Sequence, residues 1–308
     1  MKKRNVRRIL FGKKGERGLF GNIVLYALLI CIGFVFLYPF LFMLKTSFMS
    51  PEDLMNPVVT WLPSEFYIEN YIRAFKTLDF GSAFWNSLYI SLIAAILQTA
   101  AAAVTGYGLA RFRVKLKGVI TVLILATFLL PVETLLIPRY VTFNTYKILG
   151  TPLPLWLTAI TGQGLKAAVF ILVFQQIFNS YPISLDEAAE LDGAGKYKVF
   201  YKIGLPIAKP GIVLSFLFSF VWYWNETRQS GLYFGERIKT LPMKLASFSA
   251  SYESMFESAS TTADASMNIN EGLTMAGTML SCLPILILFI VLQRQFVESI
   301  EKSGITGE

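Results

Sequence analysis

Long apolar blocks alternate with shorter polar connections along this chain. Six blocks have about the length of a bilayer-spanning helix, which is on the order of 20 residues. They cover residues 19–44, 86–109, 118–138, 153–178, 211–225 and 273–292. The fourth block is interrupted by Thr161-Gly162-Gln163-Gly164, and the fifth is short. The pattern predicts an all-α membrane protein with six transmembrane helices.

Polar segments divide the rest of the chain. We expect a basic cytoplasmic tail at residues 1–18 and a C-terminal tail at 293–308. Two external segments are expected at 45–85 and 226–272, and one long cytoplasmic loop at 179–210. An even number of spans puts both termini on one side of the membrane. Basic residues are about twice as frequent on that side as on the other, so the positive-inside rule places both termini in the cytoplasm.

Composition excludes several classes of protein. The 308 residues are 54% hydrophobic with a net charge of +8, and histidine is absent. Because the excess charge follows the expected topology, it indicates membrane orientation and headgroup contact rather than nucleic-acid binding. Cys31 and Cys282 lie in apolar blocks, so they predict neither a disulfide framework nor a metal site. The missing histidine removes the commonest general base and zinc ligand, which argues against a membrane-embedded enzyme.

The loop at residues 179–210 is polar and helix-forming. Ser184 and Glu187 have the spacing of a capping box, which predicts a helix beginning there. Gly193 is a natural left-handed C-cap. A second short helix is expected over Lys196–Ile203, before Pro206 breaks the chain. A helix, a tight turn and a second helix form a shape suited to entering a cleft in another protein.

The same loop carries a family resemblance. Glu187-Ala188-Ala189, Gly193 and Ile203 with Leu205-Pro206 resemble the signature loop of ATP-binding-cassette (ABC) importer permeases. Further stretches, in order along nearly the whole chain, resemble the carbohydrate branch and its maltose-type second permease: 44–48, 61–64, 69–71, 86–87, 106–111, 129–131, 137–138, 224–226 and 293–297. The tail at 299–308 and the long stretch at 249–270 depart from the family pattern.

The resemblance implies a type I importer architecture in the bacterial plasma membrane. It implies a permease that forms half of a translocation pathway, with ATP and Mg²⁺ held by a separate ATPase. The expected partners are two ATPase copies, a second and non-identical permease, and an extracellular or periplasmic solute-binding protein. ATPase contact would fall on Glu187, Ala188, Ala189, Asp192 and Gly193. Glu187 could instead only cap its helix, and Asp192 could only be solvated.

No nucleotide site is expected in the chain itself. Gly193-Ala194-Gly195-Lys196 resembles the end of a phosphate-binding loop. That motif also needs an earlier glycine and a Ser or Thr after the lysine, but Glu190 and Tyr197 occupy those positions. We therefore expect no cofactor in this chain and no catalytic residue.

Candidate pathway residues are the polar groups inside apolar blocks. Glu133 and Lys166 are the charges deepest in them, and such charges usually face a polar pathway, although an internal ion pair would also explain them. Gln163 lies where span 4 is broken, and broken helices are tolerated where they line a cavity; a packed kink is the alternative. Trp224 and Asn225 end span 5 and could contact sugar or belong to an aromatic belt.

The competing function is an ion-coupled secondary transporter that works alone. It would need ionisable groups near the midplane on several spans, and usually internal repeats. Only Glu133 and Lys166 approach this, and the sequence shows no repeat.

Overall fold

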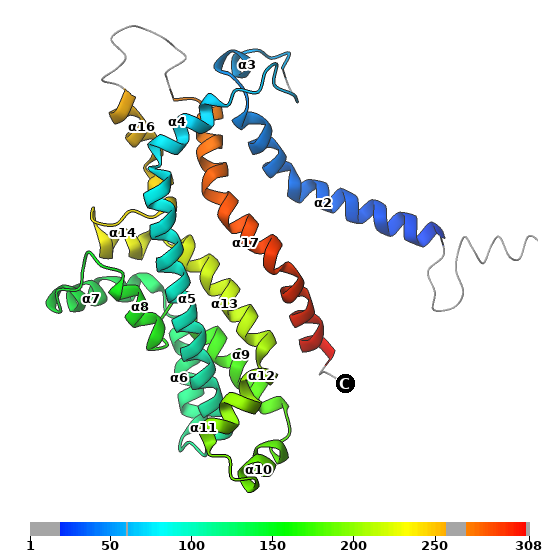
Figure 1. The fold of residues 1–308 in the computed structure, drawn as a ribbon, viewed down its shortest axis with the longest axis vertical. Helices are drawn as coiled ribbons and strands as arrows, with labels where there is room; N and C mark the ends of the chain where they lie inside the picture. Colours follow the sequence, from blue (N-terminus) through cyan, green and yellow to red (C-terminus); the bar gives the residue numbers. More distant parts are fainter. Residues whose placement is uncertain (1–18, 60, 257–268, 306–308) are drawn as a thin grey trace, which may run out of the picture. The chain divides into compact units, whose positions relative to one another are not determined.

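The computed structural model describes residues 19–59, 61–256 and 269–305. The tail expected at 1–18 and residues 257–268 of the segment expected at 226–272 lie outside these ranges. Within the described residues every regular element is a helix, which confirms the all-α prediction (Figure 1). The chain forms two compact units, Met1–Ala74 with Phe256–Leu280 and Phe75–Met255 with Ser281–Glu308.

The first unit combines two segments that are far apart in the sequence. It contains α2 (Leu19–Ser47), α3 (Pro51–Met55), most of α4 (Glu69–Thr77) and the start of α17 (Glu271–Ile305). The Asn70 amide donates to the carbonyl oxygens of Ser47 and Met49, at 3.1 and 2.9 Å. A side chain at Gly272 would approach the Met49 carbonyl oxygen within 3.0 Å. These contacts fix the start of α17 against the chain just after α2.

Three helices in the described part are long and apolar enough to span a membrane: α2, α5 (Phe80–Arg111) and Glu271–Arg294 of α17. The number rises to six if each bent pair of helices counts as one span. The third expected span is divided into α6 (Lys117–Leu129) and α7 (Val132–Thr145), which meet at 97°. The fourth is divided into α8 (Leu153–Ile160) and α9 (Ala167–Ser180).

The second unit is built around α5, which packs against α8, α9 and α13 (Lys209–Trp224). Small residues make this packing close: Ala94, Ala95, Ala102 and Ala103 of α5 are all buried. A side chain at Gly106 would lie 2.6 Å from Cβ of Phe174 and 2.8 Å from the backbone nitrogen of Gln175. Helix association in lipid depends on such small residues because they let the backbones approach.

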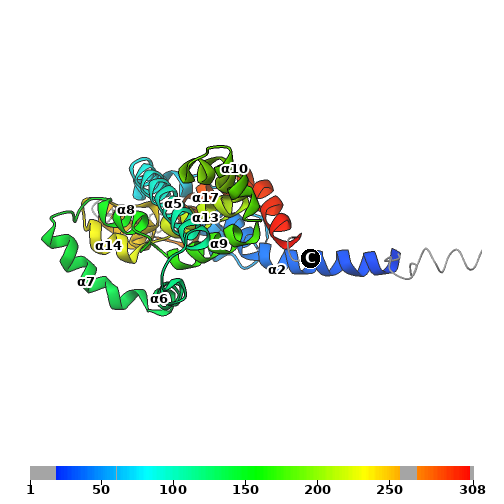
Figure 2. The same ribbon diagram turned by 90° about the horizontal axis from the view of Figure 1, so that it is seen from below.

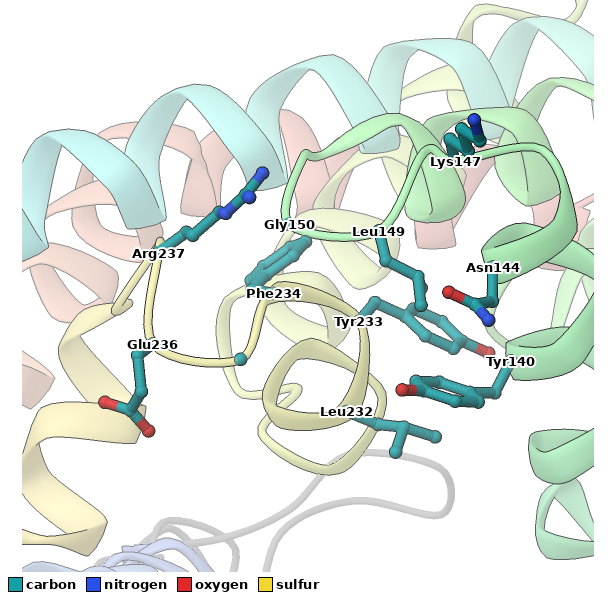
Figure 3. Close-up of a pocket in the computed structure, with 11 residues that line it drawn as sticks. Tyr140, Asn144, Lys147, Leu149, Gly150, Leu232, Tyr233, Phe234, Glu236 and Arg237 are labelled. Atoms are coloured by element: carbon teal, nitrogen blue, oxygen red, sulfur yellow. The ribbon is translucent and has the colours of Figure 1, made fainter.

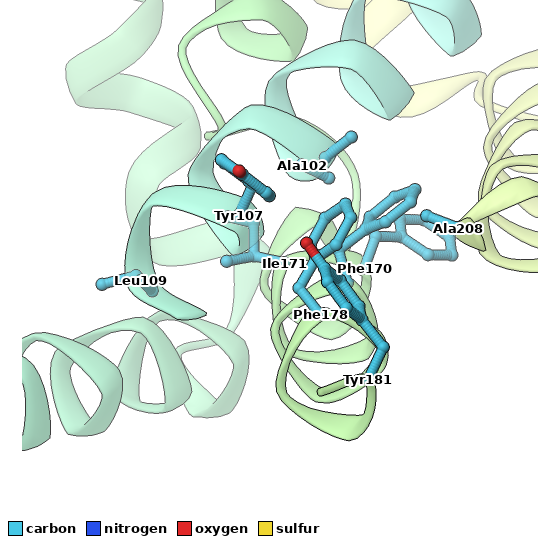
Figure 4. Close-up of a cluster of buried hydrophobic side chains, with 10 residues drawn as sticks. Ala102, Tyr107, Leu109, Phe170, Ile171, Phe178, Tyr181 and Ala208 are labelled. Carbon is cyan, nitrogen blue, oxygen red and sulfur yellow. The ribbon is translucent and has the colours of Figure 1, made fainter. Parts of the chain in front are cut away.

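An aromatic cluster closes one end of the second unit. Tyr107 of α5 contacts Phe178 of α9 and Phe200, with ring centroids 5.1 and 4.7 Å apart. Ile171 belongs to the same buried cluster (Figure 4), and so does Phe174. Because Phe200 belongs to the polar loop, this cluster attaches the loop to the helical core. Figure 2 shows α7 leading from α6 back to α8 at the edge of the unit.

Candidate functional site: an anchored loop and a broken helix

The polar loop folds as the sequence predicts at its turn. It consists of α10 (Ser184–Leu191), α11 (Lys196–Val199), a π-helical turn (Phe200–Gly204) and α12 (Leu205–Ile207). Gly193 follows α10 with φ +80°. Its N–H donates to the Glu190 carbonyl at 3.0 Å, and the Ala194 N–H donates to the Ala189 carbonyl at 2.9 Å. This is a Schellman C-cap, which confirms the predicted role of Gly193.

The predicted capping box is wrong. Ile183, not Ser184, occupies the N-cap position of α10, and no side chain caps the helix. The backbone N–H groups of Asp186 and Glu187 donate instead to the Ile183 carbonyl, at 2.9 and 3.1 Å. The helix therefore begins one residue earlier than a serine cap requires, which places Ser184 inside the first turn.

A buried ion pair anchors the first turn of α10 to the end of α5. The Arg111 Nε lies 3.4 Å from Oδ2 of Asp186, and the two side chains are only 6% and 11% exposed. Arg111 Nη2 also donates to the Tyr181 carbonyl at 2.7 Å, and its guanidinium lies 3.5 Å from the centre of the Tyr181 ring. Within the described residues the Nε itself has no hydrogen-bond partner, so the contact with Asp186 is an ion pair rather than a hydrogen bond.

Tyr181 completes the anchor. Its hydroxyl donates to both carboxylate oxygens of Asp186, at 3.0 and 3.3 Å. Burial, followed by this hydrogen bond, raises the pKa of Tyr181 well above its ordinary value. Sequence reasoning missed this group of three. Arg111 was the one member with a role in the sequence analysis. It was counted among the basic residues that indicate membrane orientation, and it ends the stretch at 106–111 that resembles the family.

The outer surface of the loop is exposed and partly apolar. Glu187, Ala188, Asp192 and Gly193 are exposed, and Ala189 is half-buried. Leu191 and Tyr197 flank the turn with 90% and 92% of their surface exposed. Large apolar side chains grouped on a surface mark an interaction site more often than single ones do. The loop therefore combines a buried inner attachment with an outer face that carries both acidic and apolar side chains.

The second polar region is the break between α8 and α9 at residues 161–166. Gln98 of α5 donates to the Leu165 carbonyl at 2.9 Å and to the Ser219 hydroxyl at 2.8 Å. Tyr223 of α13 donates to Gln98 Oε1 at 2.8 Å, and its oxygen accepts from the Leu165 N–H at 3.3 Å. Buried side chains thus satisfy the non-helical backbone, as irregular structure within an apolar region requires.

Two cavities of about 300 Å³ each adjoin this break and share Leu165, Lys166 and Gln229. The first is also lined by Glu133, Trp222 and Asn225, among others. The second is also lined by Arg139, Gln163 and the first residues of α9. The structure therefore gathers four of the five predicted pathway residues, Glu133, Gln163, Lys166 and Asn225, around two adjoining cavities.

The contacts of these residues differ from one another. Glu133 forms an exposed ion pair with Arg228, with Oε1 and Nη1 2.6 Å apart. Gln163 accepts a hydrogen bond from Arg139 through its carbonyl, at 3.1 Å. Trp224, the fifth predicted residue, is 1% exposed and contacts Phe84 and Phe220. It lines neither of the two cavities, and Trp222 is the indole that does.

A further cavity of about 580 Å³ contains none of the predicted residues. Tyr140, Asn144 and Tyr233 lie on one side of it, and Glu236 and Arg237 on another (Figure 3). The buried hydroxyl of Tyr233 has no hydrogen-bond partner in the part of the chain that the structure describes. No group of His, Cys, Asp or Glu in the described ranges could hold a metal ion.

Together, the helical fold and the apolar spans define a multi-pass membrane protein, and a polar loop connects two of its helices. The chain matches the model for the inner membrane component of binding-protein-dependent transport systems over residues 102–302. It belongs to this family. The family is a transport component rather than an enzyme, and its systems employ a binding protein and an ATPase.

Relatives of known name agree with this assignment. The chain is 27% identical to a lactose transport system permease protein of Rhizobium radiobacter, over 90% of this chain and 94% of that protein. It is 29% identical to a diacetylchitobiose uptake system permease protein of Streptomyces coelicolor, over 95% of this chain and the whole of that protein. These similarities support an ABC importer permease, not an ion-coupled secondary transporter.

A solved structure shares the fold. It belongs to a bacterial ABC transporter involved in the import of the acidic polysaccharide alginate, and it matches with a TM-score of 0.72 and 21% identity. The match covers 89% of this chain and 96% of that chain.

Proposed function

We propose that this chain is one permease subunit of an ATP-driven carbohydrate importer. The named relatives transport sugars, and each is similar to this chain over nearly its whole length. The partners in this proposal are a second, non-identical permease, two copies of an ATPase subunit and a solute-binding protein. Both termini and the loop at 179–210 are cytoplasmic, as the distribution of basic residues favours.

The observation that carries the coupling role is the anchored loop. The buried pair of Arg111 and Asp186 joins α10 to α5, and α5 packs against α8, α9 and α13 of its unit. A displacement of the loop is therefore transmitted to the spans. Closure of the ATPase pair on the loop favours one arrangement of the spans, and release favours the other, which is a population shift driven by differential affinity.

The proposed contact surface is the outer face of α10 and its turn. Leu191 and Tyr197 supply apolar area, and Glu187 supplies a carboxylate for a basic group of the ATPase. Ala188, Ala189 and Gly193 allow close approach because they carry little or no side chain. Asp192 lies at the same exposed edge. ATP and Mg²⁺ bind to the partner in this proposal, and this chain supplies no group to them.

Co-purification with the gene products encoded beside this chain tests the proposal. Glu187→Arg is expected to abolish recovery of the ATPase while membrane insertion stays normal. Glu253→Arg is the matched control, because Glu253 is exposed on α16 (Phe248–Phe256), outside the loop, and undergoes the same change of charge. Unchanged assembly in Glu187→Arg would limit Glu187 to a structural role. Transport by the purified chain without any ATPase would contradict the whole proposal.

A further inference from the structure

Two cations at the break between α8 and α9 lack compensating carboxylates. The Lys166 ammonium lies 4.6 Å from the centre of the Trp222 ring, and among the described residues it pairs with no carboxylate. The hydrogen bond that Arg139 makes within the described residues goes to the carbonyl oxygen of Gln163, which is neutral. Both residues line the second of the two cavities, whose walls include no acidic residue. Unpaired charges are expensive in a membrane-embedded region, so this cavity is suited to an anion.

The start of α9 adds a further favourable charge. Ala167 and Ala168 line the same cavity and form the first turn of a 14-residue helix. Within the described ranges the Ala168 N–H has no acceptor. The N-terminus of a helix carries a partial positive charge and free N–H groups, and both favour a negatively charged group.

Gln229 adds a hydrogen-bond donor to the wall of both cavities. Gln229 of α14 (Arg228–Phe234) is 4% exposed and lines both cavities. Its backbone N–H donates to Glu226 Oε1 at 2.8 Å, but its side-chain amide makes no hydrogen bond in the described part of the chain. The amide atoms are not among the fully buried, unpaired ones, so the amide opens to the wall shared by the two cavities and can donate to a group bound there.

We infer that the second cavity binds a carboxylate carried by the transported sugar, so that the solute is an acidic carbohydrate. Arg139, Lys166 and the start of α9 hold the carboxylate, and Gln229 donates to an oxygen of the same sugar. The first cavity, with Trp222 and Asn225, receives the adjoining ring, because indole rings present apolar surface to sugar faces. This inference rests on the proposed importer function and deepens it by specifying the class of solute.

The anionic headgroup of a lipid has the same chemistry as a sugar carboxylate, so the experiment separates the two sources. This chain is purified as a complex with the proteins encoded by the neighbouring genes. The complex is placed in nanodiscs of phosphatidylcholine alone, or of phosphatidylcholine with phosphatidylglycerol. Its thermal midpoint is measured with disaccharides of galacturonate, glucuronate and mannuronate. Each sugar is compared with its dimethyl ester, which keeps the ring and removes the charge.

At least one acidic disaccharide is expected to raise the midpoint in pure phosphatidylcholine, while its ester has no effect. Lys166→Gln and Arg139→Gln are each expected to weaken this apparent affinity roughly tenfold or more, because a hydrogen bond to a charged group is lost. Lys147→Gln is the matched control: Lys147 is also an exposed lysine with positive φ, but it lines neither cavity. It is expected to bind the acidic disaccharide as the parent chain does.

Three outcomes would overturn the inference. In the first, the esters stabilise the complex to the same extent as the acids. In the second, no acidic disaccharide stabilises the complex. In the third, phosphatidylglycerol without any sugar stabilises it, and Lys166→Gln removes that effect. The last result would assign the cations to a lipid headgroup. A complex that assembles with its ATPase but gives any of these results leaves the proposed function intact, so the two failures are distinguishable.

Discussion

The loop at α10–α12 and the break between α8 and α9 are both polar interruptions of an apolar chain, but they are stabilised differently. The loop is fixed by an ion pair between Arg111 and Asp186 that the protein itself completes. The break is fixed by neutral hydrogen bonds: Gln98 donates to the Leu165 carbonyl, and the Tyr223 hydroxyl accepts from the Leu165 N–H. Among the described residues, no carboxylate forms an ion pair with Arg139 or Lys166. The buried charges of the loop neutralise each other, which fits the proposed role of transmitting movement to the spans. The cations of the break have no such countercharge, which fits the proposed binding of an anion.

The largest expected effect comes from breaking the anchor. Arg111→Ala leaves Asp186 buried without a countercharge, which typically costs about 3–5 kcal/mol. Chemical denaturation in detergent micelles measures the loss. Replacing both partners, as Arg111→Met with Asp186→Leu, is expected to restore most of the stability. A small effect of Arg111→Ala alone would mean that the pair does not fix the loop.

The next largest effect is expected from removing the uncharged hydrogen bonds that Gln98 makes at the break between α8 and α9. Gln98→Leu leaves the Leu165 carbonyl without its donor and is expected to cost about 1–3 kcal/mol. Gln163→Leu is the control, because the Gln163 side chain is exposed and, in the described part of the chain, only its backbone groups are hydrogen-bonded. Denaturation of the two variants under the same conditions should separate them. Equal losses would contradict the role assigned to Gln98.

A smaller effect concerns the turn of the loop. Gly193 has φ +80°, whereas Gly195 has φ −68°, and neither has an atom near the place of a new side chain. Gly193→Ala is therefore expected to cost about 1 kcal/mol from backbone strain, with Gly195→Ala close to neutral. Protease susceptibility of the loop, measured for both variants, checks this difference. Equal susceptibility would mean that the turn tolerates a side chain at both positions.

The smallest effect is a dependence on pH. The pKa of Tyr181 is raised in the folded protein by burial and by the hydrogen bond to Asp186. A raised folded pKa means that this stabilising contribution is complete below the unfolded pKa of about 10 and is lost as the pH rises toward the folded pKa. Tyrosinate absorbance of the parent chain, compared with Tyr181→Phe, should show one tyrosine that ionises late. A tyrosine that titrates normally would contradict the anchor geometry.

Much of the architecture followed from pattern alone. Residues 19–44, 86–109 and 273–292 each fall within a single long helix, because their apolar runs are long and continuous. The left-handed turn at Gly193 was also predictable, since glycine tolerates that conformation and the preceding residues favour a helix. The bend of 97° between α6 and α7 was not predicted, because an apolar block indicates its length but not whether it stays straight.

The contents of the two sites were harder to predict. Glu133, Gln163, Lys166 and Asn225 could be selected because polar residues in apolar blocks are costly. Trp222 and Trp224 could not be told apart by sequence, since which indole faces a cavity depends on how α13 is rotated against α5. Gln98 and Gln229 carried no signal, because their partners or cavities are formed by distant segments.

The sequence by itself determined the class of protein, the positions of its three long apolar helices and the position of its polar loop, because these depend on local hydrophobicity, charge and turn chemistry. The tertiary structure decided which charges are paired. Arg111 and Asp186 are far apart in the chain, yet they meet because α5 and α9 end at the same place. Lys166 and Arg139 come together without a carboxylate for a similar reason: α7 and α9 converge on one cavity. Whether a charged side chain lies next to an opposite charge of the same protein depends on how the helices pack, and the local sequence does not specify this packing.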